Sequence, residues 1–306
     1  MNLVASDPVL IGVDWGTSSL RAYLISAQGD VLDRVVVAEG IMHVADGKFE
    51  CVLQRLIEPW ISEYSVPVIA SGMITSRNGW LETAYLPVPS GAKELAEALV
   101  PVPTAKGLVL SFVTGLTTNH SGPPDVMRGE ETQIVGAVEA GLDECVFVMP
   151  GTHSKWVSVR GSCIVSFETF MSGEIYAALR SHTILGALMN DSPFNEEGFR
   201  EGVAAGLDAG AKLLHTLFHV RTMPLLGKIS EDKVADFLSG MLIGAEINGA
   251  TEQTLIDMPV VIVGRDDLAD RYAIALQVSG KQSACAPDDI VARGHFSIAA
   301  SAGLLS

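Results

Sequence analysis

Short runs of apolar residues alternate along the chain with longer segments in which apolar positions recur every three or four residues. The short runs are rich in β-branched residues and are bounded by glycine or proline, which is typical of buried strands. The longer segments have the spacing of amphipathic helices. The runs are 9–13, 67–70, 145–149 and 259–263, and the helical segments are 130–140, 172–179, 197–217 and 232–248. This alternation predicts an α/β fold.

One pattern occurs twice. An apolar strand runs into Asp14-Trp15-Gly16-Thr17-Ser18-Ser19, and two further strands follow at 20–25 and from residue 31. The same order returns around Gly151-Thr152-His153-Ser154. The strands that follow this second corner are 155–159 and 163–167. The two Gly-Thr corners are about one domain length apart, so the repeat predicts two similar domains. Because strand–turn–strand units are common, a chance recurrence is the alternative.

We expect the first domain to span residues 1–140 and the second 141–306. The proline-rich segment 86–103 is expected to be a linker or a surface excursion around one short helix. An apolar helix face from Phe237 to Ile247 fits either a core or an interface, so the sequence leaves a homo-oligomer open.

The chain is strongly acidic. Its 306 residues carry 20 Lys and Arg against 36 Asp and Glu, a formal net charge of -16. Nucleic acids and anionic membranes are therefore not expected as partners. A small anion would have to be held locally, by backbone N–H groups, a few placed cationic side chains or a metal ion. Four scattered cysteines and the lack of a long apolar run argue against a zinc site, a disulfide framework and a membrane span, which favours a cytoplasmic enzyme.

The two corners have the chemistry of phosphate sites. A Gly-Thr corner between strands exposes backbone N–H groups and hydroxyls, and glycine allows a phosphate to come close. Asp14, at the end of a strand, can hold the Mg²⁺ that accompanies a nucleotide, or can act simply as the acceptor of an Asx turn. Arg21 follows on the next strand and can contact phosphate with two N–H groups. The chain has neither a P-loop nor the protein-kinase motifs.

These residues resemble conserved elements of the sugar kinase/Hsp70/actin ATPase superfamily. The run from Asp14 to Arg21 and the corner Gly151-Thr152 are similar to its two phosphate motifs, and the strand that ends at Gly264 is similar to its adenosine motif. The resemblance implies two actin-like (ribonuclease H-like) ATPase domains with ATP in the cleft between them.

A closer resemblance extends over most of the chain. It rests on five blocks, namely 70–74, 77–80, 125–133, 150–156 and 170–174. They resemble the 2-dehydro-3-deoxygalactonokinase family, which implies phosphorylation of the 6-hydroxyl of 2-dehydro-3-deoxy-D-galactonate in galactonate breakdown, with ATP and Mg²⁺. The gluconate epimer as substrate and a phosphohydrolase of the same fold remain the alternatives.

Roles for individual residues follow from these resemblances and from the chemistry of phosphoryl transfer, which needs charge neutralisation and a base. Asp14 is the expected Mg²⁺ ligand. Glu130 is the expected base, Asp125 is its competitor, and Glu131 stays open; carboxylates in a first helical turn can also serve only the helix dipole. The expected nucleotide ligands are Gly16, Thr17, Ser18, Ser19, Arg21, Gly151, Thr152, His153, Ser154, Lys155 and Gly264. The expected ligands of the sugar acid are Ser71, Gly72, Met73, Arg77, Trp80 and Arg128.

Overall fold

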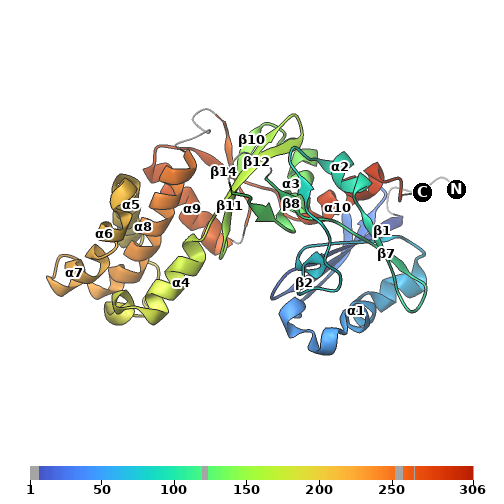
Figure 1. The fold of residues 1–306 in the computed structure, drawn as a ribbon, viewed down its shortest axis with the longest axis horizontal. Coiled ribbons are helices and arrows are strands. Elements are labelled where there is room, and N and C mark those ends of the chain that lie inside the picture. Colours follow the sequence, from blue (N-terminus) through green and yellow to red (C-terminus); the bar gives the residue numbers. More distant parts are fainter. Residues whose placement is uncertain (1–6, 119–122, 252–257, 265, 306) are drawn as a thin grey trace. The chain divides into compact units, whose positions relative to one another are not determined.

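The computed structural model describes residues 7–118, 123–251, 258–264 and 266–305. The chain divides into two compact units (Figure 1). Unit 1 consists of Met1–Glu144, Val159–Ser166 and Pro287–Ser306, and unit 2 consists of Cys145–Ser158 and Phe167–Ala286. The units differ from the expected division at residue 140, because the C-terminal segment packs with the N-terminal half of the chain.

Unit 1 is built on a six-stranded sheet with the order β3-β2-β1-β4-β7-β6. The strands are β1 Pro8–Trp15, β2 Leu20–Ser26, β3 Val31–Val37, β4 Val68–Ser71, β6 Val100–Pro103 and β7 Val109–Phe112. The first three strands form an antiparallel meander, whereas β4 runs parallel to both β1 and β7. Because β1 and β4 are covered on both faces, nearly all of their residues are buried.

Helices and a small sheet complete unit 1. Helix α1 (Phe49–Glu63) places Leu53, Ile57 and Trp60 in the core at helical spacing. The other elements are α2 Ala92–Glu97, α3 Glu130–Glu139, α10 Ile290–Ser301, and a three-stranded sheet of β5 Leu86–Pro87, β8 Leu116–Thr117 and β9 Val126–Met127. The proline-rich segment is thus not a plain linker, since it contains β5, α2 and β6.

Unit 2 has a five-stranded sheet with the order β12-β11-β10-β13-β14. Its strands are β10 Cys145–Met149, β11 Ser154–Arg160, β12 Cys163–Phe170, β13 Val260–Ile262 and β14 Ser283–Cys285. This order corresponds to β3-β2-β1-β4-β7 of unit 1, and β13 and β14 run parallel to β10 as β4 and β7 run parallel to β1. Unit 1 has one strand more, β6, which pairs antiparallel with β7 at the edge of the sheet. The repeat seen in the sequence is therefore a repeat of topology.

The helices of unit 2 are α4 Ser172–His182, α5 Glu196–Ala209, α6 Leu213–Thr216, α7 His219–Leu225, α8 Glu231–Thr251 and α9 Asp266–Val278. The single helix expected over 197–217 is broken, because the chain bends at Gly210, whose φ is 45°. The apolar face from Phe237 to Ile247 is core: both residues are buried against other parts of unit 2.

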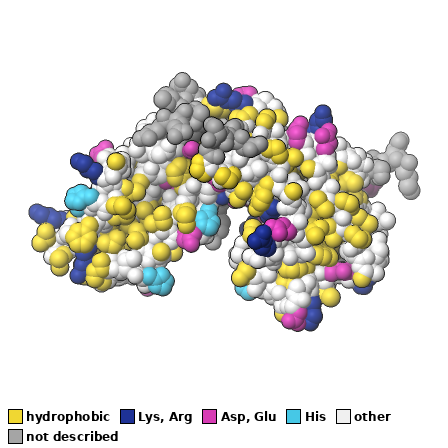
Figure 2. All heavy atoms as spheres, viewed as in Figure 1, with side chains coloured by type: hydrophobic (Ala, Val, Ile, Leu, Met, Phe, Trp, Pro, Cys, Tyr) yellow, Lys and Arg dark blue, Asp and Glu magenta, His cyan; other side chains and the backbone are white. Residues whose placement is uncertain are grey.

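Short 3₁₀ turns link several elements, at Ile41–His43, Ala45–Gly47, Met73–Thr75, Ile184–Leu188 and Gly210–Lys212. Figure 2 shows hydrophobic side chains gathered on the surface around α6 and α7, where Leu214, Phe218, Leu225 and Leu226 are exposed. Among the described residues, no helix has both the length and the hydropathy needed to cross a membrane.

Candidate active site

Asp14 lies at the carboxyl end of the central strand of unit 1. It is opposite Arg21 in the antiparallel register of β1 and β2, and Arg21 Nη1 is 3.3 Å from Asp14 Oδ2. The Asp14 side chain is only 12% exposed. Burial raises the pKa of Asp14 because it disfavours the charged carboxylate; Arg21 opposes the rise and the charge of Glu130 adds to it. A bound cation at this carboxylate would offset that desolvation.

The first corner, Gly16 to Ser19, is held by backbone hydrogen bonds. The Gly16 N–H donates to the Ser19 carbonyl oxygen at 2.9 Å, and the carbonyls of Gly16 and Thr17 accept from the N–H groups of Ile41 and Met42. Thr17 and Ser18 are exposed. The corner therefore presents polar groups to solvent from a fixed backbone, as a phosphate site requires.

Carboxylates open helix α3. Gly129, at the N-cap, has a φ of 106°, and its N–H donates to Glu131 Oε2 at 2.7 Å. Glu130 Oε2 accepts from the Arg128 N–H at 2.9 Å. Glu131 is fully buried, and burial, with the charge of Glu130, raises its pKa to about 8. Glu131 is thus largely protonated at neutral pH, which leaves Glu130 as the partly exposed carboxylate of the pair.

Asp125 lies away from this helix start, between the strands β8 and β9. Its backbone N–H donates to Thr118 Oγ1 at 2.9 Å, and its Oδ1 accepts from the Val126 N–H at 2.7 Å. Glu130 acts electrostatically on Asp14, whereas Asp125 is not among the groups that shift the pKa of Asp14. Of the two carboxylates, Glu130 is therefore the one whose charge contributes to the raised pKa of Asp14.

The segments that follow β1 and β4 and the start of α3 lie close together at the carboxyl ends of β1 and β4. Ser71 is the register partner of Asp14. Gly72 has a φ of 92°, and a Cβ there would lie 2.9 Å from the Trp15 carbonyl oxygen. A Cβ on Gly129 would lie 3.1 Å from the Gly72 Cα. Only glycine fits at Gly72 and Gly129, so the expected substrate loop and the start of α3 are packed against the end of β1.

The two candidate arginines differ sharply. Arg128 is buried, and its Nη1 donates to Thr75 Oγ1 and Thr83 Oγ1, both at 2.6 Å. Its guanidinium also stacks on the Tyr85 ring, with Cζ 4.3 Å from the ring centroid, and its Nε has no partner among the described residues. Arg77 is 84% exposed, and its Nε lies 3.5 Å from Glu82 Oε2. Arg128 therefore braces the loop around Thr75, whereas Arg77 is available to a ligand.

Two further residues of the expected sugar site are placed differently. Met73 opens the 3₁₀ turn Met73–Thr75 and is half-buried. Trp80 packs edge-on against Phe112, with centroids 5.8 Å apart, next to the core of unit 1. The Trp80 ring is thus largely a packing element.

Ser71 has a buried partner that the sequence did not indicate. Its Oγ is 2.8 Å from Nε2 of His295, which lies on α10. Burial lowers the pKa of His295 to about 3, so the ring is neutral. Its Nδ1 has no partner in the described structure. An unpaired acceptor costs less than an unpaired N–H, so we assign the proton to Nε2, which then donates to Ser71 Oγ.

In unit 2, the second corner is fastened to helix α4. The Glu174 N–H donates to the Thr152 carbonyl at 3.0 Å, and His153 Nε2 lies 2.6 Å from Glu174 Oε2. Lys155 is buried in β11 rather than solvated at a strand edge. Ser154 Oγ lies 2.8 Å from the hydroxyl of Tyr272, on α9. Gly264 is exposed, and a Cβ there would lie 3.4 Å from Pro150 Cδ, beside the corner.

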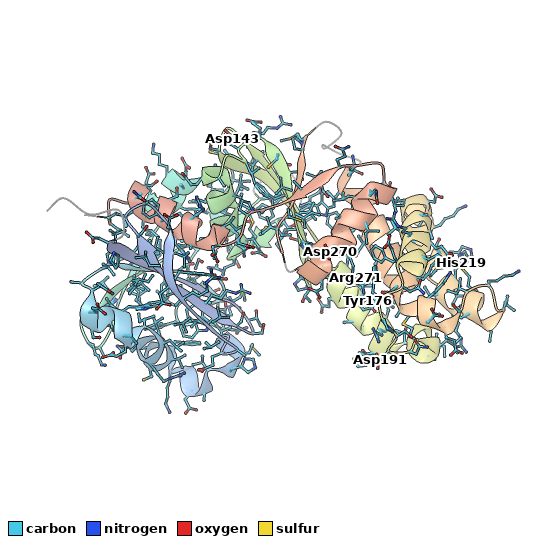
Figure 3. All side chains as sticks on the ribbon, turned by 180° about the vertical axis from the view of Figure 1, so that it is seen from behind. Asp143, Tyr176, Asp191, His219, Asp270 and Arg271 are labelled. Carbon is cyan, nitrogen blue, oxygen red and sulfur yellow. The ribbon has the colours of Figure 1, made fainter. Side chains whose placement is uncertain are left out.

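A cavity of about 300 Å³ opens next to this corner. Figure 3 labels two of its lining side chains, Tyr176 on α4 and Arg271 on α9. Arg271 Nη1 lies 2.7 Å from Asp236 Oδ1, and its guanidinium stacks on Phe194 at 4.3 Å. The full lining is Gly151, Ser172, Gly173, Tyr176, Arg180, Ser239, Leu242, Ile243, Leu268, Arg271 and Tyr272. Aromatic, apolar and cationic groups around a glycine corner suit a nucleotide.

The described residues contain no group of three or more His, Cys, Asp or Glu side chains arranged to hold a metal ion.

Two units whose sheets share the order third, second, first, fourth for their first four strands, each with a glycine corner after the first strand, define an α/β protein of the actin-like ATPase fold. At the level of fold alone, the chain is similar to component A of (R)-2-hydroxyglutaryl-CoA dehydratase from Acidaminococcus fermentans. The TM-score is 0.52 at 11% identity, over 97% of this chain and 100% of that one. The family model for 2-keto-3-deoxy-galactonokinase matches residues 14–298, and the chain belongs to that family.

Two relatives support the assignment at higher identity. The chain is 35% identical over 291 residues to 2-dehydro-3-deoxygalactonokinase of Escherichia coli K12, which covers 94% of this chain and 97% of the relative. The crystal structure of a Sinorhizobium meliloti protein assigned as a 2-dehydro-3-deoxygalactonokinase superimposes with a TM-score of 0.87 at 33% identity. The match covers 96% of this chain and 98% of that one. The resemblance inferred from the sequence blocks is confirmed.

Proposed function

We propose that the chain transfers the γ-phosphoryl group of ATP to the 6-hydroxyl of 2-dehydro-3-deoxy-D-galactonate. Family membership makes the protein a carbohydrate kinase that takes a small sugar acid and ATP as substrates. The choice of the 6-hydroxyl, the need for Mg²⁺ and the roles of individual residues belong to the proposal. The observation that carries it is the close packing, within unit 1, of the start of α3 on the end of β1: a Cβ on Gly129 would lie 3.1 Å from the Gly72 Cα, and a Cβ on Gly72 would lie 3.3 Å from Asp14 Oδ1.

Glu130 accepts the proton of the attacking hydroxyl in this scheme. The O6–phosphorus bond forms as the bond from the γ-phosphorus to the β,γ-bridging oxygen breaks, and ADP leaves. Glu130 is suited to this step because it is partly exposed, whereas Glu131 is buried and largely protonated. The Arg128 N–H holds Glu130 Oε2, which limits the rotamers of the base.

Asp14 is the proposed anchor for Mg²⁺. The fit rests on the chemistry of the site: a desolvated carboxylate with a raised pKa is favoured in its charged form by a nearby cation. When bound, the ion neutralises negative charge on the phosphate oxygens. Arg21, which is half-exposed beside Asp14, can supply further positive charge to the same phosphates.

We assign the N–H groups and hydroxyls of Gly16, Thr17, Ser18 and Ser19 to phosphate binding. In unit 2 we assign the second corner to the nucleotide as well, and the neighbouring cavity to its nucleoside. The residues concerned are Gly151, Thr152, His153, Ser154, Lys155 and Gly264. Support comes from the exposed polar corner in unit 1 and from the cavity beside the corner in unit 2.

For the sugar acid we propose contacts with the loop that follows β4. Ser71, Gly72 and Met73 lie at the carboxyl end of a parallel strand, where α/β proteins commonly build sites. Arg77 is the proposed partner of the carboxylate because its guanidinium is exposed. Arg128 supports this loop through Thr75 and Thr83, and Trp80 supports it by packing.

The proposal is tested by measuring ADP formation with ATP and Mg²⁺ in the presence of the galactonate-derived acid, of its gluconate epimer, and of no acceptor. We expect rapid turnover with the first acid, slower turnover with the epimer and little without an acceptor. Faster turnover of the epimer would indicate that the gluconate-derived acid is the substrate. Release of inorganic phosphate without an acceptor would indicate a phosphohydrolase.

A further inference from the structure

A buried carboxylate, Glu246 on α8, lies beneath the second corner and has no role in the scheme above. It is 2% exposed. Its Oε1 accepts from Trp156 Nε1 at 2.9 Å, and the Tyr272 hydroxyl is 3.0 Å from Oε1 and 2.9 Å from Oε2. The side chains of Ser154 and Ser172 also hydrogen-bond to it. Burying a carboxylate costs free energy unless the carboxylate is hydrogen-bonded. The neutral donors of this cluster supply those hydrogen bonds to Glu246.

The partners of Glu246 come from three other elements. Trp156 and Ser154 belong to β11, Ser172 begins α4, and Tyr272 lies on α9. Ser172 and Tyr272 line the cavity, and Ser154 ends the second corner. One carboxylate thus ties together β11, α4, α8 and α9 at the place where the nucleotide is proposed to bind.

The position of α4 also determines the shape of the corner. The Glu174 N–H holds the Thr152 carbonyl at 3.0 Å, and a Cβ on Gly173 would lie 2.3 Å from the Gly151 carbonyl oxygen. Helix and corner are therefore in direct backbone contact. Ser172 links α4 to Glu246, so a shift of α4 would also move the corner.

The carboxylate also sets the direction of the hydrogen bonds. Burial raises the pKa of Glu246, and the hydrogen bonds from Ser172, Trp156, Tyr272 and Ser154 oppose the rise because they stabilise the charged form. The Tyr272 hydroxyl donates its single proton to Glu246. The Ser154 hydroxyl, 2.8 Å from the Tyr272 oxygen, then points its own proton into the cluster. The Ser154 side chain is thereby held inward, in one rotamer, at the end of the corner.

We propose that Glu246 is a positioning residue for the nucleotide: by fixing Ser154, Ser172 and Tyr272 it holds the second corner and the cavity in the shape that binds a nucleoside polyphosphate. This inference rests on the proposed use of ATP. It predicts that a change at Glu246 weakens nucleotide binding specifically, without affecting the sugar acid, whose proposed ligands are in unit 1.

The test is Glu246→Gln, which keeps the size of the side chain but turns one acceptor into a donor that faces Trp156 or Tyr272. ADP is the probe, because its binding can be measured by calorimetry without turnover. We expect the Kd for ADP and the KM for ATP to rise about tenfold or more, since an amide N–H placed against Trp156 Nε1 or the Tyr272 hydroxyl breaks a buried hydrogen bond of the cluster. The KM for the sugar acid should stay within about twofold.

Two further variants control for folding. Leu238→Ala, on the same helix and fully buried in the core, should lower the melting temperature but leave the Kd for ADP unchanged. Tyr272→Phe removes the hydroxyl that joins Ser154 to Glu246, and should also weaken ADP binding. This variant provides the test if Glu246→Gln does not fold.

Unchanged ADP affinity in the folded Glu246→Gln or Tyr272→Phe protein would overturn the inference. So would a loss no larger than that in Leu238→Ala, or an equal loss of affinity for the sugar acid. The proposed function fails separately: in that case the wild-type protein neither binds ADP nor consumes ATP.

Discussion

At the scale of single residues, the site contains carboxylates that differ in how deeply they are buried and in the direction of their pKa shifts. Asp14 is desolvated but faces Arg21, Glu131 is fully buried with its pKa raised to about 8, and Glu130 between them is partly exposed. Asp14, at the carboxyl end of β1, and the two glutamates at the start of α3 therefore have three different tasks available to them. This separation of protonation behaviour is how α/β enzymes obtain an acid, a base and a cation ligand from one residue type.

Replacing the proposed base tests this division. Glu130→Gln keeps the hydrogen bond from the Arg128 N–H but removes the basic oxygen, so kcat should fall about a hundredfold or more, with the KM for ATP little changed. Asp125→Asn is the matched control, and we expect a kcat close to that of the wild type. Steady-state kinetics on both variants decide the assignment, which moves to Asp125 if the two results are exchanged.

Glu131 makes a prediction about stability and pH. Its pKa is about 8 in the folded protein against an ordinary value of 4.5, so the folded state keeps a proton that the unfolded chain has lost between these values. The free energy of unfolding should therefore fall as pH rises from about 4.5 to 8 and then level off. Glu131→Gln, which has no titrating group, should show a flatter profile. Urea titrations at pH 5, 7 and 9 measure the difference, and parallel profiles would contradict the raised pKa.

At the scale of elements, close helix pairs shape both units. Helices α5 and α8 approach through Gly202, Gly206, Gly240 and Gly244, where a Cβ would lie 2.0–2.3 Å from the carbonyl oxygens of the facing helix. Helices α3 and α10 do the same through Gly136 and Gly294. Helix α3, which bears the proposed base, is thus packed closely against α10.

A pair of substitutions in α8 tests the helix contact. Gly244→Ala places a methyl group 2.3 Å from the Val203 carbonyl oxygen, so α5 and α8 must separate, and we expect a loss of about 1–3 kcal/mol. Gly249→Ala meets only the Phe170 ring, at 3.3 Å, and should be neutral or stabilising by up to about 1 kcal/mol through helix propensity. Chemical denaturation of both variants measures the contrast. Equal effects would show that close packing does not determine the contact.

Several elements could be predicted from the sequence. The hairpins after both corners and the helices α3, α4 and α8 follow from period and turn residues, and the structure places them within a few residues of the expected bounds. Helix α10 was missed, and the break at Gly210 was not expected. Glycines spaced by four in α5 were a signal for close helix packing that hydrophobic periodicity does not register.

The site was predictable in part. Asp14, Arg21, the glycine corners and the carboxylates of α3 could be named as candidates because motif residues lie close together in the sequence. His295 and Glu246 could not, because each meets its partners only through the tertiary fold: His295 is 224 positions from Ser71. An acidic residue within the apolar run of α8 was the one available hint for Glu246. The hydrogen bonds from Arg128 to Thr75 and Thr83 could likewise not be predicted, since these threonines are distant from Arg128 in the sequence.

At the scale of the whole molecule, unit 1 is not formed by the first part of the chain alone, because it also includes Val159–Ser166 and Pro287–Ser306. The last helix, α10, returns to unit 1, where Ala292, His295, Ile298 and Ala299 are fully buried. It packs on α3 and on β1, the two elements that bear Glu130 and Asp14. The C-terminus is therefore part of the structural support of the proposed catalytic groups.

Truncation tests this support. A chain that ends at residue 286 lacks α10 and exposes the apolar faces of α3 and β1, so we expect unit 1 to lose its cooperative unfolding transition. Trp15, Trp60 and Trp80 all lie in unit 1, and their fluorescence reports the loss. Removal of residues 303–306, which follow the helix, is the control and should leave the transition in place. A cooperative transition in the shorter chain would refute the role assigned to α10.

The site of phosphorylation tests the central claim most directly. The protein is incubated with ATP, Mg²⁺ and 2-dehydro-3-deoxy-D-galactonate, and the product is examined by phosphorus and carbon NMR spectroscopy. We expect one phosphate ester per ADP, with the phosphorus coupled to C6 of the sugar acid. A phosphate on another oxygen, or free phosphate formed without the ester, would contradict the account.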